Sequence, residues 1–250
     1  MSIIRIFLAT VLCFPAAFAA EGTFPVEDGF LSIDFSQFTE TRVEEHGLDL
    51  LYAPAGWTDR LAKYNKLMID QPEIWIDADS KYKGVKPDNV KAIADLIRDT
   101  LIQKALSRGR EVVEEPGPDV LYLRVALTDL YLKNEKRGIL GYVPIGAAVK
   151  LVADQVRDMM SKVDIIEMAI QGELQDSESG EVLLALIIKR GARKDKASGQ
   201  KEQRMEFGEF REVVQMYGAR LSCRLDNAKL AESQRIECLD MKVLEAAGYL

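Results

Sequence analysis

The strongest constraint on the fold is the alternation of apolar and polar residues in two stretches of the chain. In residues 121–128 the apolar side chains stand at every second position, and residues 165–175 largely repeat this pattern. Because successive side chains of a β-strand point to opposite faces, the spacing predicts two half-buried strands. Residues 176–180 have the composition of a hairpin loop, and the nearly continuous apolar run over residues 182–189 predicts a returning strand in a central position.

Helical periodicity occurs on both sides of these strands. Pro87 opens a helix whose apolar residues recur at three- and four-residue steps, and we expect it to end near Gly109. A second apolar stripe predicts a helix over residues 207–225. Further helices are expected over residues 57–64 and 230–247.

The first strand region, residues 66–76, is interrupted by Pro72. Proline has no N–H to donate to a strand ladder, so Pro72 predicts a break, a bulge or an edge position. The expected order is then strand, helix, strand, helical insertion, strand, strand, helix, helix. We predict an α+β fold in which helices pack on one face of a small mixed or mostly antiparallel sheet.

The chain divides into four segments. Residues 1–19 form a signal peptide, and residues 20–56 form an N-terminal arm, either extended or folded as a small subelement. Residues 57–226 form a single α/β domain, and residues 227–250 form a C-terminal helical tail.

The insertion within the domain, residues 134–163, combines glycines and a proline with apolar residues and then an amphipathic stretch. One interpretation is a crossover helix that packs into the core, because apolar stripes of this kind usually do so. The other is a segment that contacts a membrane or another subunit. Charges of both signs on its polar side weaken the membrane version.

The first residues carry the pattern of a cleavable export signal. Arg5 supplies a positive charge, residues 6–14 are apolar apart from one threonine, and Ala17 and Ala19 provide small residues before a cut ahead of Ala20. The apolar run is shorter than the roughly 20 residues that a transmembrane helix needs. We therefore predict cleavage between Ala19 and Ala20 and a periplasmic or secreted product.

The three cysteines have different expected roles. Cys13 lies in the apolar part of the leader after the large residue Leu12, which argues against lipid modification at this position. Cys223 and Cys238 remain in the mature chain, and an even pair in an oxidising compartment predicts a disulfide. Two free thiols or a link between chains are the alternatives.

Charge and residue types narrow the functional classes. The chain has 33 basic and 40 acidic residues, a net charge of −7, so it lacks the basic field of a nucleic-acid-binding protein. The single histidine, His46, has no partners for a catalytic triad or a multi-histidine metal site. The acidic string Asp77 to Lys81 predicts a turn, because a lysine stands where a calcium loop needs an oxygen ligand.

We therefore assign no catalytic, cofactor-binding or metal-binding residue, and we favour a protein that is not an enzyme. Pairs of acidic residues such as Glu114 and Glu115 are more often solvated than catalytic, although dispersed carboxylates can also form a glycosidase-like site. The basic loop over residues 189–204 is either a solvated hairpin extension or a contact for anionic lipid, polysaccharide or an acidic protein.

Several strings in the chain resemble the domain of unknown function 3313 family, in the order found in that family. The resemblance extends from about Gly29 to Asp226. It implies an exported bacterial protein with no established activity, often a lipoprotein. This chain differs in lacking a lipid-attachment motif and in adding residues 227–250. The matching strings are Tyr64-Asn65-Lys66-Leu67-Met68-Ile69-Asp70-Gln71-Pro72, Asp79-Ser80-Lys81-Tyr82-Lys83-Gly84, Glu115-Pro116-Gly117-Pro118, Leu123-Arg124-Val125-Ala126-Leu127-Thr128-Asp129, Asp176-Ser177 with Gly180-Glu181, and Phe207-Gly208-Glu209.

These features favour a non-enzymatic protein of the cell envelope that binds another envelope protein or assembles with itself. One alternative is an envelope hydrolase that uses dispersed carboxylates. Another is a membrane-associated or pore subunit that acts through residues 134–163, with membrane contact not favoured.

Overall fold

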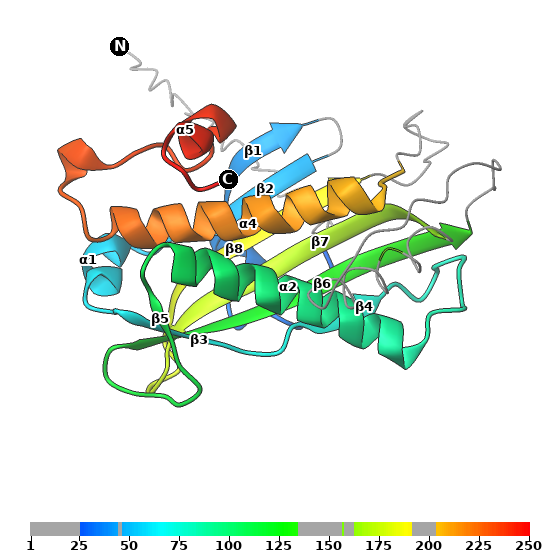
Figure 1. Ribbon diagram of the computed structural model, residues 1–250, viewed down its shortest axis with the longest axis horizontal. Helices are drawn as coiled ribbons and strands as arrows, with labels where there is room; N and C mark the ends of the chain where they lie inside the picture. The colour runs from blue at the N-terminus through cyan, green and yellow to red at the C-terminus, as the bar shows by residue number, and fades with distance from the viewer. Residues whose placement is uncertain (1–25, 45–46, 135–156, 158–162, 192–203) are drawn as a thin grey trace, which may run out of the picture.

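The computed structural model describes residues 26–44, 47–134, 157, 163–191 and 204–250 of the chain. Its central element is a single eight-stranded sheet, against which two long helices pack (Figure 1). The strands are β1 Thr39–Glu44, β2 Gly47–Tyr52, β3 Lys66–Ile69, β4 Glu73–Ile76, β5 Glu111–Val112, β6 Val120–Asn134, β7 Val163–Asp176 and β8 Val182–Gly191. The helices are α1 Trp57–Ala62, α2 Pro87–Ser107, α4 Phe207–Asn227 and α5 Met241–Ala246, with short 3-10 turns at Phe35–Gln37 and Glu232–Gln234.

The strand order is β1-β2-β8-β7-β6-β3-β5, and β4 also pairs with β6. Strands β1, β2, β8, β7 and β6 pair successively in antiparallel fashion, whereas β3 and β4 run parallel to β6. The predicted α+β class with a mixed, mostly antiparallel sheet is confirmed. The returning strand β8 lies between β2 and β7, so its predicted interior position is also confirmed.

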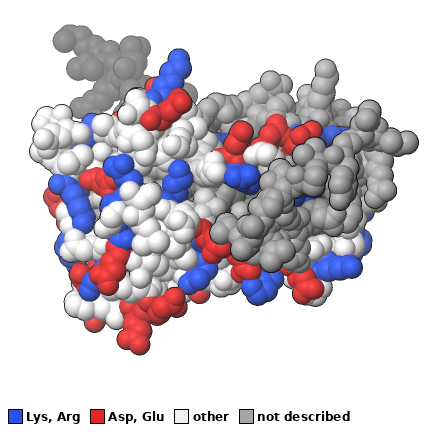
Figure 2. Space-filling model, viewed as in Figure 1, with Lys and Arg blue, Asp and Glu red and all other residues white. Residues whose placement is uncertain are grey.

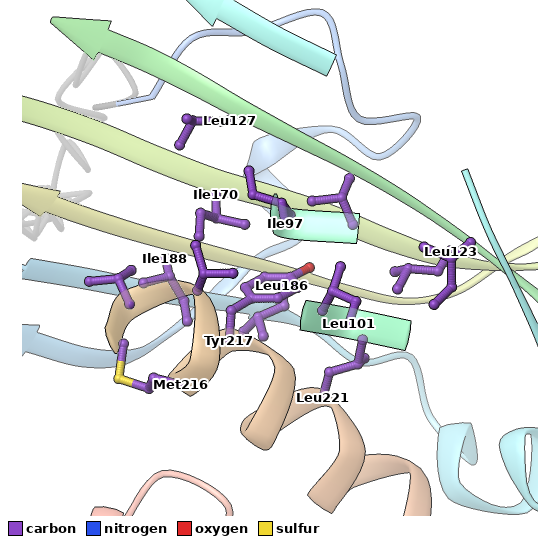
Figure 3. Packing of buried hydrophobic residues seen from close by; sticks show 14 of the residues in the cluster. Ile97, Leu101, Leu123, Leu127, Ile170, Leu186, Ile188, Met216, Tyr217 and Leu221 are labelled. Carbon is purple, nitrogen blue, oxygen red and sulfur yellow. The ribbon is translucent and has the colours of Figure 1, made fainter. Parts of the chain in front are cut away.

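The main core lies between the sheet and the helix pair α2 and α4 (Figure 3). Every second residue of the long strands points into it, which is the buried face that the alternation predicts. Tyr217 of α4 lies over Gly172 of β7, where a Cβ atom would overlap the tyrosine hydroxyl. The core residues labelled in Figure 3 are Ile97, Leu101, Leu123, Leu127, Ile170, Leu186, Ile188, Met216, Tyr217 and Leu221.

Pro72 breaks the first strand region in the predicted way. Strand β3 ends at Ile69 and β4 begins at Glu73, and both pair with β6, so together they form one interrupted strand beside β6. Helix α2 begins at Pro87, as predicted. Behind its last turn, Gly109 adopts the left-handed conformation (φ +71°) that allows the chain to reverse into β5.

The N-terminal segment contributes to the same sheet. Strands β1 and β2 pair with each other in antiparallel fashion, and β2 also pairs with β8. Residues 26–38 lie against the opposite face of the sheet from α2 and α4, where Val26 packs with Leu50, Ala169 and Ile187. The four segment boundaries stay a prediction.

The expected continuous helix over residues 230–247 is wrong. A 3-10 turn at Glu232–Gln234 is followed by extended chain, and only Met241–Ala246 is helical. Side-chain contacts explain the interruption, because Asn227 holds the backbone of Ile236 through both its amide nitrogen and its carbonyl oxygen. Asp240 then caps α5 by accepting hydrogen bonds from the first backbone N–H groups of the helix.

A buried ion cluster connects the helix layer with the β1–β2 hairpin. Asp49 of β2 is fully buried and binds Arg220 of α4 and Arg190 of β8, the latter at 2.6 Å. Arg224, one turn further along α4, is also buried, and burial together with the charge of Arg220 lowers the pKa of Arg224 to about 10. Asp49 is therefore the shared acceptor for the guanidinium groups of Arg190 and Arg220.

We predict that Asp49→Ala strongly destabilises the protein, because it leaves buried arginine charge without its counter-ion. The expected loss of unfolding free energy is about 3–5 kcal/mol, measured by urea denaturation of the mature chain. The matched control is Glu181→Ala, which removes the exposed partner of Arg60 and should cost less than about 1 kcal/mol. Equal costs for the two variants would contradict the role of Asp49.

Candidate functional site

Three of the strings that carry the family resemblance meet at one end of the sheet. The hydroxyl of Tyr64, just before β3, donates to Asp176 at the end of β7 (2.5 Å). Ser177 contacts Gly117 through two hydrogen bonds of 3.0 Å, one to its N–H and one to its C=O. Lys229, behind α4, donates to the side chain of Asn65. These contacts join the β7–β8 hairpin, the loop before β6 and the corner before β3.

The hydrogen bond from Tyr64 is the largest cause that lowers the pKa of Asp176 to about 2, and donors from Ser179 and Glu178 add to it. Burial and the neighbouring carboxylate raise the pKa of Tyr64 in turn. Tyr64 is buried, and its hydroxyl is bound by the carboxylate of Asp176. This junction therefore stabilises the fold by connecting the β7–β8 hairpin with the corner before β3.

The low pKa of Asp176 predicts a pH-dependent contribution to stability. The contribution is present above the unfolded-state pKa of about 4 and is lost as the pH falls through about 2. We expect Asp176→Asn to reduce the loss of unfolding free energy between about pH 4 and 2, measured by urea denaturation at each pH. Glu178→Gln, an exposed change in the same loop, should leave the pH profile unaltered. An identical profile for Asp176→Asn and the unmodified chain would refute the prediction.

A shallow hollow of about 580 Å³ lies beside this junction, along residues 112–120 and Lys66. Its lining includes the acidic residues Glu114, Glu115 and Asp119, which are the candidates for the alternative of a hydrolase with dispersed carboxylates. Glu114 and Glu115 are exposed, and Asp119 forms an ion pair with Lys66 at 3.3 Å. The hollow thus holds solvated carboxylates rather than a sheltered pair.

An apolar groove of about 560 Å³ opens between β4 and the first half of α2. One wall is the strand break at Pro72 and the side chain of Ile74, and the other is the face of α2 that begins at Val90. Asp95 on α2 accepts hydrogen bonds from Gln71 and Lys91 beside the groove. The full lining is Gln71, Pro72, Ile74, Val85, Pro87, Val90, Lys91 and Ala94.

The groove follows from two local features of the sequence. Pro72 interrupts the edge of the sheet, and Ala94 presents only a methyl group at a position where a larger residue would fill the space. The amino group of Lys91 is bound by Asp95 at 2.5 Å, and this contact lowers the pKa of Asp95. The charges beside the groove are therefore paired, and its walls are mainly apolar.

The predicted disulfide is present. Cys223 of α4 and Cys238 of the following loop are bonded, with their Cα atoms 5.7 Å apart. The bond pins the C-terminal segment onto the outer side of α4, where Leu244 and Tyr249 complete a small second core with Ala219. The tail is held there by a covalent bond and apolar packing together.

Several predicted features lie outside the described residues: the cleavage site at Ala19 and Ala20, His46, and most of the ranges 134–163 and 189–204. The predicted turn at Asp77 is described, and the carboxylate of Asp77 accepts a hydrogen bond from the N–H of Asp79. Within the described residues, no group of three or more metal-ligating side chains is placed to hold an ion. No helix in that same part of the chain is long and apolar enough to cross a membrane.

Sequence reasoning missed the groove and the Asp49 ion cluster. Val90 belongs to the apolar stripe that predicts the helix after Pro87, and periodicity alone does not show that the sheet leaves this part of the stripe uncovered. Asp49 did carry a signal, since it stands between Leu48 and Leu50 in an otherwise apolar stretch. In the described part of the face shown in Figure 2, basic and acidic side chains are interspersed.

Comparison with solved structures finds several distant similarities. The PelC dodecamer from Paraburkholderia phytofirmans is 14% identical, with a TM-score of 0.32 over 61% of this chain and 87% of that one. Protein XCC0632 from Xanthomonas campestris is 12% identical, with a TM-score of 0.34 over 68% and 86% of the two chains. A minor lipoprotein from Acinetobacter baumannii is 12% identical, with a TM-score of 0.27 over 64% and 93%.

Among curated proteins the comparison finds no match. One family model matches residues 27–221, which is most of the chain and close to the extent that the sequence motifs predict. The chain belongs to the family described as "Protein of unknown function (DUF3313)".

Proposed function

We propose that the mature chain is a non-enzymatic protein of the cell envelope that binds a segment of another protein, or of a second copy of itself, in the groove between β4 and α2. The observation that carries the proposal is the apolar groove itself. Apolar grooves next to a strand or helix are a common way for proteins to bind a segment of a partner. Here the rim is supplied by Gln71, Lys91 and Asp95.

The strand beside the groove supports an extended occupant. Among the described residues, β4 pairs with β6 alone, so its outer edge makes no strand pairing with that part of the chain. An extended segment that adds to a sheet edge gains main-chain hydrogen bonds, and its alternate side chains enter the neighbouring groove. We therefore expect the occupant to present uncharged apolar side chains at every second position.

Two features support a location outside the cytoplasm. The leader pattern that ends at Ala19 directs export, and the disulfide between Cys223 and Cys238 is the kind of bond that persists in oxidising compartments. We infer a periplasmic or secreted product.

The other two functional classes have less support. A hydrolase needs an acid and a base held in position, and the carboxylates around the second hollow are exposed or bound to Lys66. A role in membrane association or pore formation would rest on residues 134–163, most of which lie outside the described part of the chain.

The groove is tested with a photo-reactive amino acid placed at Lys91, whose side chain is largely exposed at the rim, in the exported chain inside cells. Irradiation should give a discrete cross-linked product. Its mass distinguishes a second copy of this chain from another protein. The same amino acid at Leu106, an exposed position on α2 far from the groove, is the control and should give no product of that size.

A second substitution shows whether the cross-link depends on the groove. Val90→Asp places a charge in its apolar wall and should reduce the cross-link from Lys91 at least about tenfold, because a partner would have to bury an unpaired carboxylate. Leu106→Asp introduces the same charge elsewhere on α2 and should leave the product unchanged. A product that persists with Val90→Asp, or that is equal from both positions, would rule out the groove as the binding site.

A further inference from the structure

Residues 26–33, which we call the strap, cross the face of the sheet opposite α2 and α4 without forming a helix or strand (Figure 1). Their partners are strand residues that alternate with those of the main core. Glu173, for example, lies between Gly172 and Leu174 of β7, and Leu174 belongs to the core beneath the helices. The strap is thus bound by side chains of the sheet rather than by a strand ladder.

The first contact consists of hydrogen bonds to the backbone of Glu27. The carboxylate of Asp129 accepts a hydrogen bond from the Glu27 N–H (3.1 Å to each oxygen), and the amide of Gln171 donates to the Glu27 carbonyl (2.8 Å). Asp129 is placed at this point by an irregularity in β6, where its φ of +53° is rare for a residue other than glycine. Both polar groups of the Glu27 backbone are therefore recognised, whatever its side chain.

The second contact is five residues further along. Glu173, whose side chain is fully buried, accepts one hydrogen bond from the Ser32 N–H and another from the Ser32 hydroxyl, both at 2.9 Å. Arg124 and Gln175 also donate to Glu173, at 2.6 and 2.7 Å. These sheet residues would keep one another paired in the absence of Ser32.

Two apolar residues also anchor the strap, Val26 just before the first contact and Phe30 between the two contacts. Val26 and Phe30 are each about 95% buried or more. The ring of Phe30 meets Trp75 edge to face at 6.2 Å, and the guanidinium of Arg124 lies over it at 4.8 Å. The strap therefore has the features of a bound peptide: two backbone contacts and two side-chain anchors.

The surface beneath the strap combines an apolar part, where Leu50, Ala169 and Ile187 contact Val26, with several buried polar side chains. It includes Arg124, Thr128, Asp129, Gln171 and Glu173, and the carbonyl oxygen of Gln171 has no hydrogen-bond partner in the described structure. If the strap leaves, water can solvate these groups, so uncovering them costs far less than uncovering apolar residues. The apolar residues that the strap covers belong to a cluster separate from the main core, so detachment of the strap would leave the main core covered by α2 and α4.

We infer that this face binds an extended peptide. When two copies of the chain associate, the peptide that it binds is the strap of the other copy. The observed occupant is the chain's own segment, so a second copy offers the same Val26, Phe30 and Ser32 at the same spacing. Exchange of an identical segment preserves every contact and is a low-cost route to assembly. The surface lies on the opposite face of the sheet from α2, so it does not depend on the groove beside β4.

Hydrogen exchange of the unmodified mature chain tests whether the strap detaches. The amides of Glu27 and Ser32 should exchange through a local opening that urea hardly affects, whereas the amide of Ile170 in β7 should exchange only with global unfolding. If Glu27 and Ser32 follow the same urea dependence as Ile170, the strap is an inseparable part of the core and the inference fails.

Peptide binding tests the surface itself. A fluorescently labelled peptide of residues 26–34 is titrated with the mature chain and with Phe30→Ala, which weakens the chain's own strap. The variant should bind the peptide at least tenfold more tightly, because less of the surface is occupied by its own strap, and circular dichroism checks that it is folded. A peptide with alanine in place of Phe30 is the matched control and should bind at least tenfold more weakly. Equal binding of the two peptides, or none to the variant, would overturn the inference.

Discussion

The ion cluster around Asp49 is the constraint on which the arrangement of layers depends. The buried carboxylate of Asp49 and the buried guanidinium of Arg220 are tolerable only when they meet, since each charge alone would cost several kcal/mol in a dry core, and the largely buried Arg190 adds a second ion pair. Asp49 therefore fixes α4, β8 and the β1–β2 hairpin in one relative position. Arg220 also contacts the backbone of Leu239, so the same side chain connects the C-terminal segment to the sheet. The disulfide at Cys223, three residues along α4, reinforces this connection covalently.

The two faces of the sheet have different chemistry. One face carries the main core that stabilises the fold, and the other carries the polar side chains that bind the strap. The face beneath α2 and α4 is mainly apolar and forms the main core, apart from the ion cluster around Asp49. The opposite face carries Arg124, Gln171 and Glu173 and is covered by a segment without regular structure. A polar face can be uncovered in water at modest cost, whereas an apolar one cannot. The groove beside β4 is a third environment, at the place where Pro72 interrupts the edge of the sheet.

Most of the fold could be predicted because the long elements have strong periodicity. The alternation around Leu123 and the stripe around Ile97 each specify one buried face, and both faces meet in the same core. The C-terminal segment could not be predicted in the same way. Its composition is compatible with a helix, but Asn227 and Cys238 hold the chain in an extended path. Such side-chain contacts override a weak local preference.

The sequence by itself determined the type of the long described elements, the interruption at Pro72 and the pair Cys223 and Cys238, and the export signal stays a prediction. All of these depend on residues close together in the chain, or on residue type alone. Only the tertiary structure decided that Asp49 meets Arg220, that the strap lies on Glu173, and that a groove remains beside Val90. Each of these joins residues that are distant in sequence, and no local pattern records which polar groups will share a buried site.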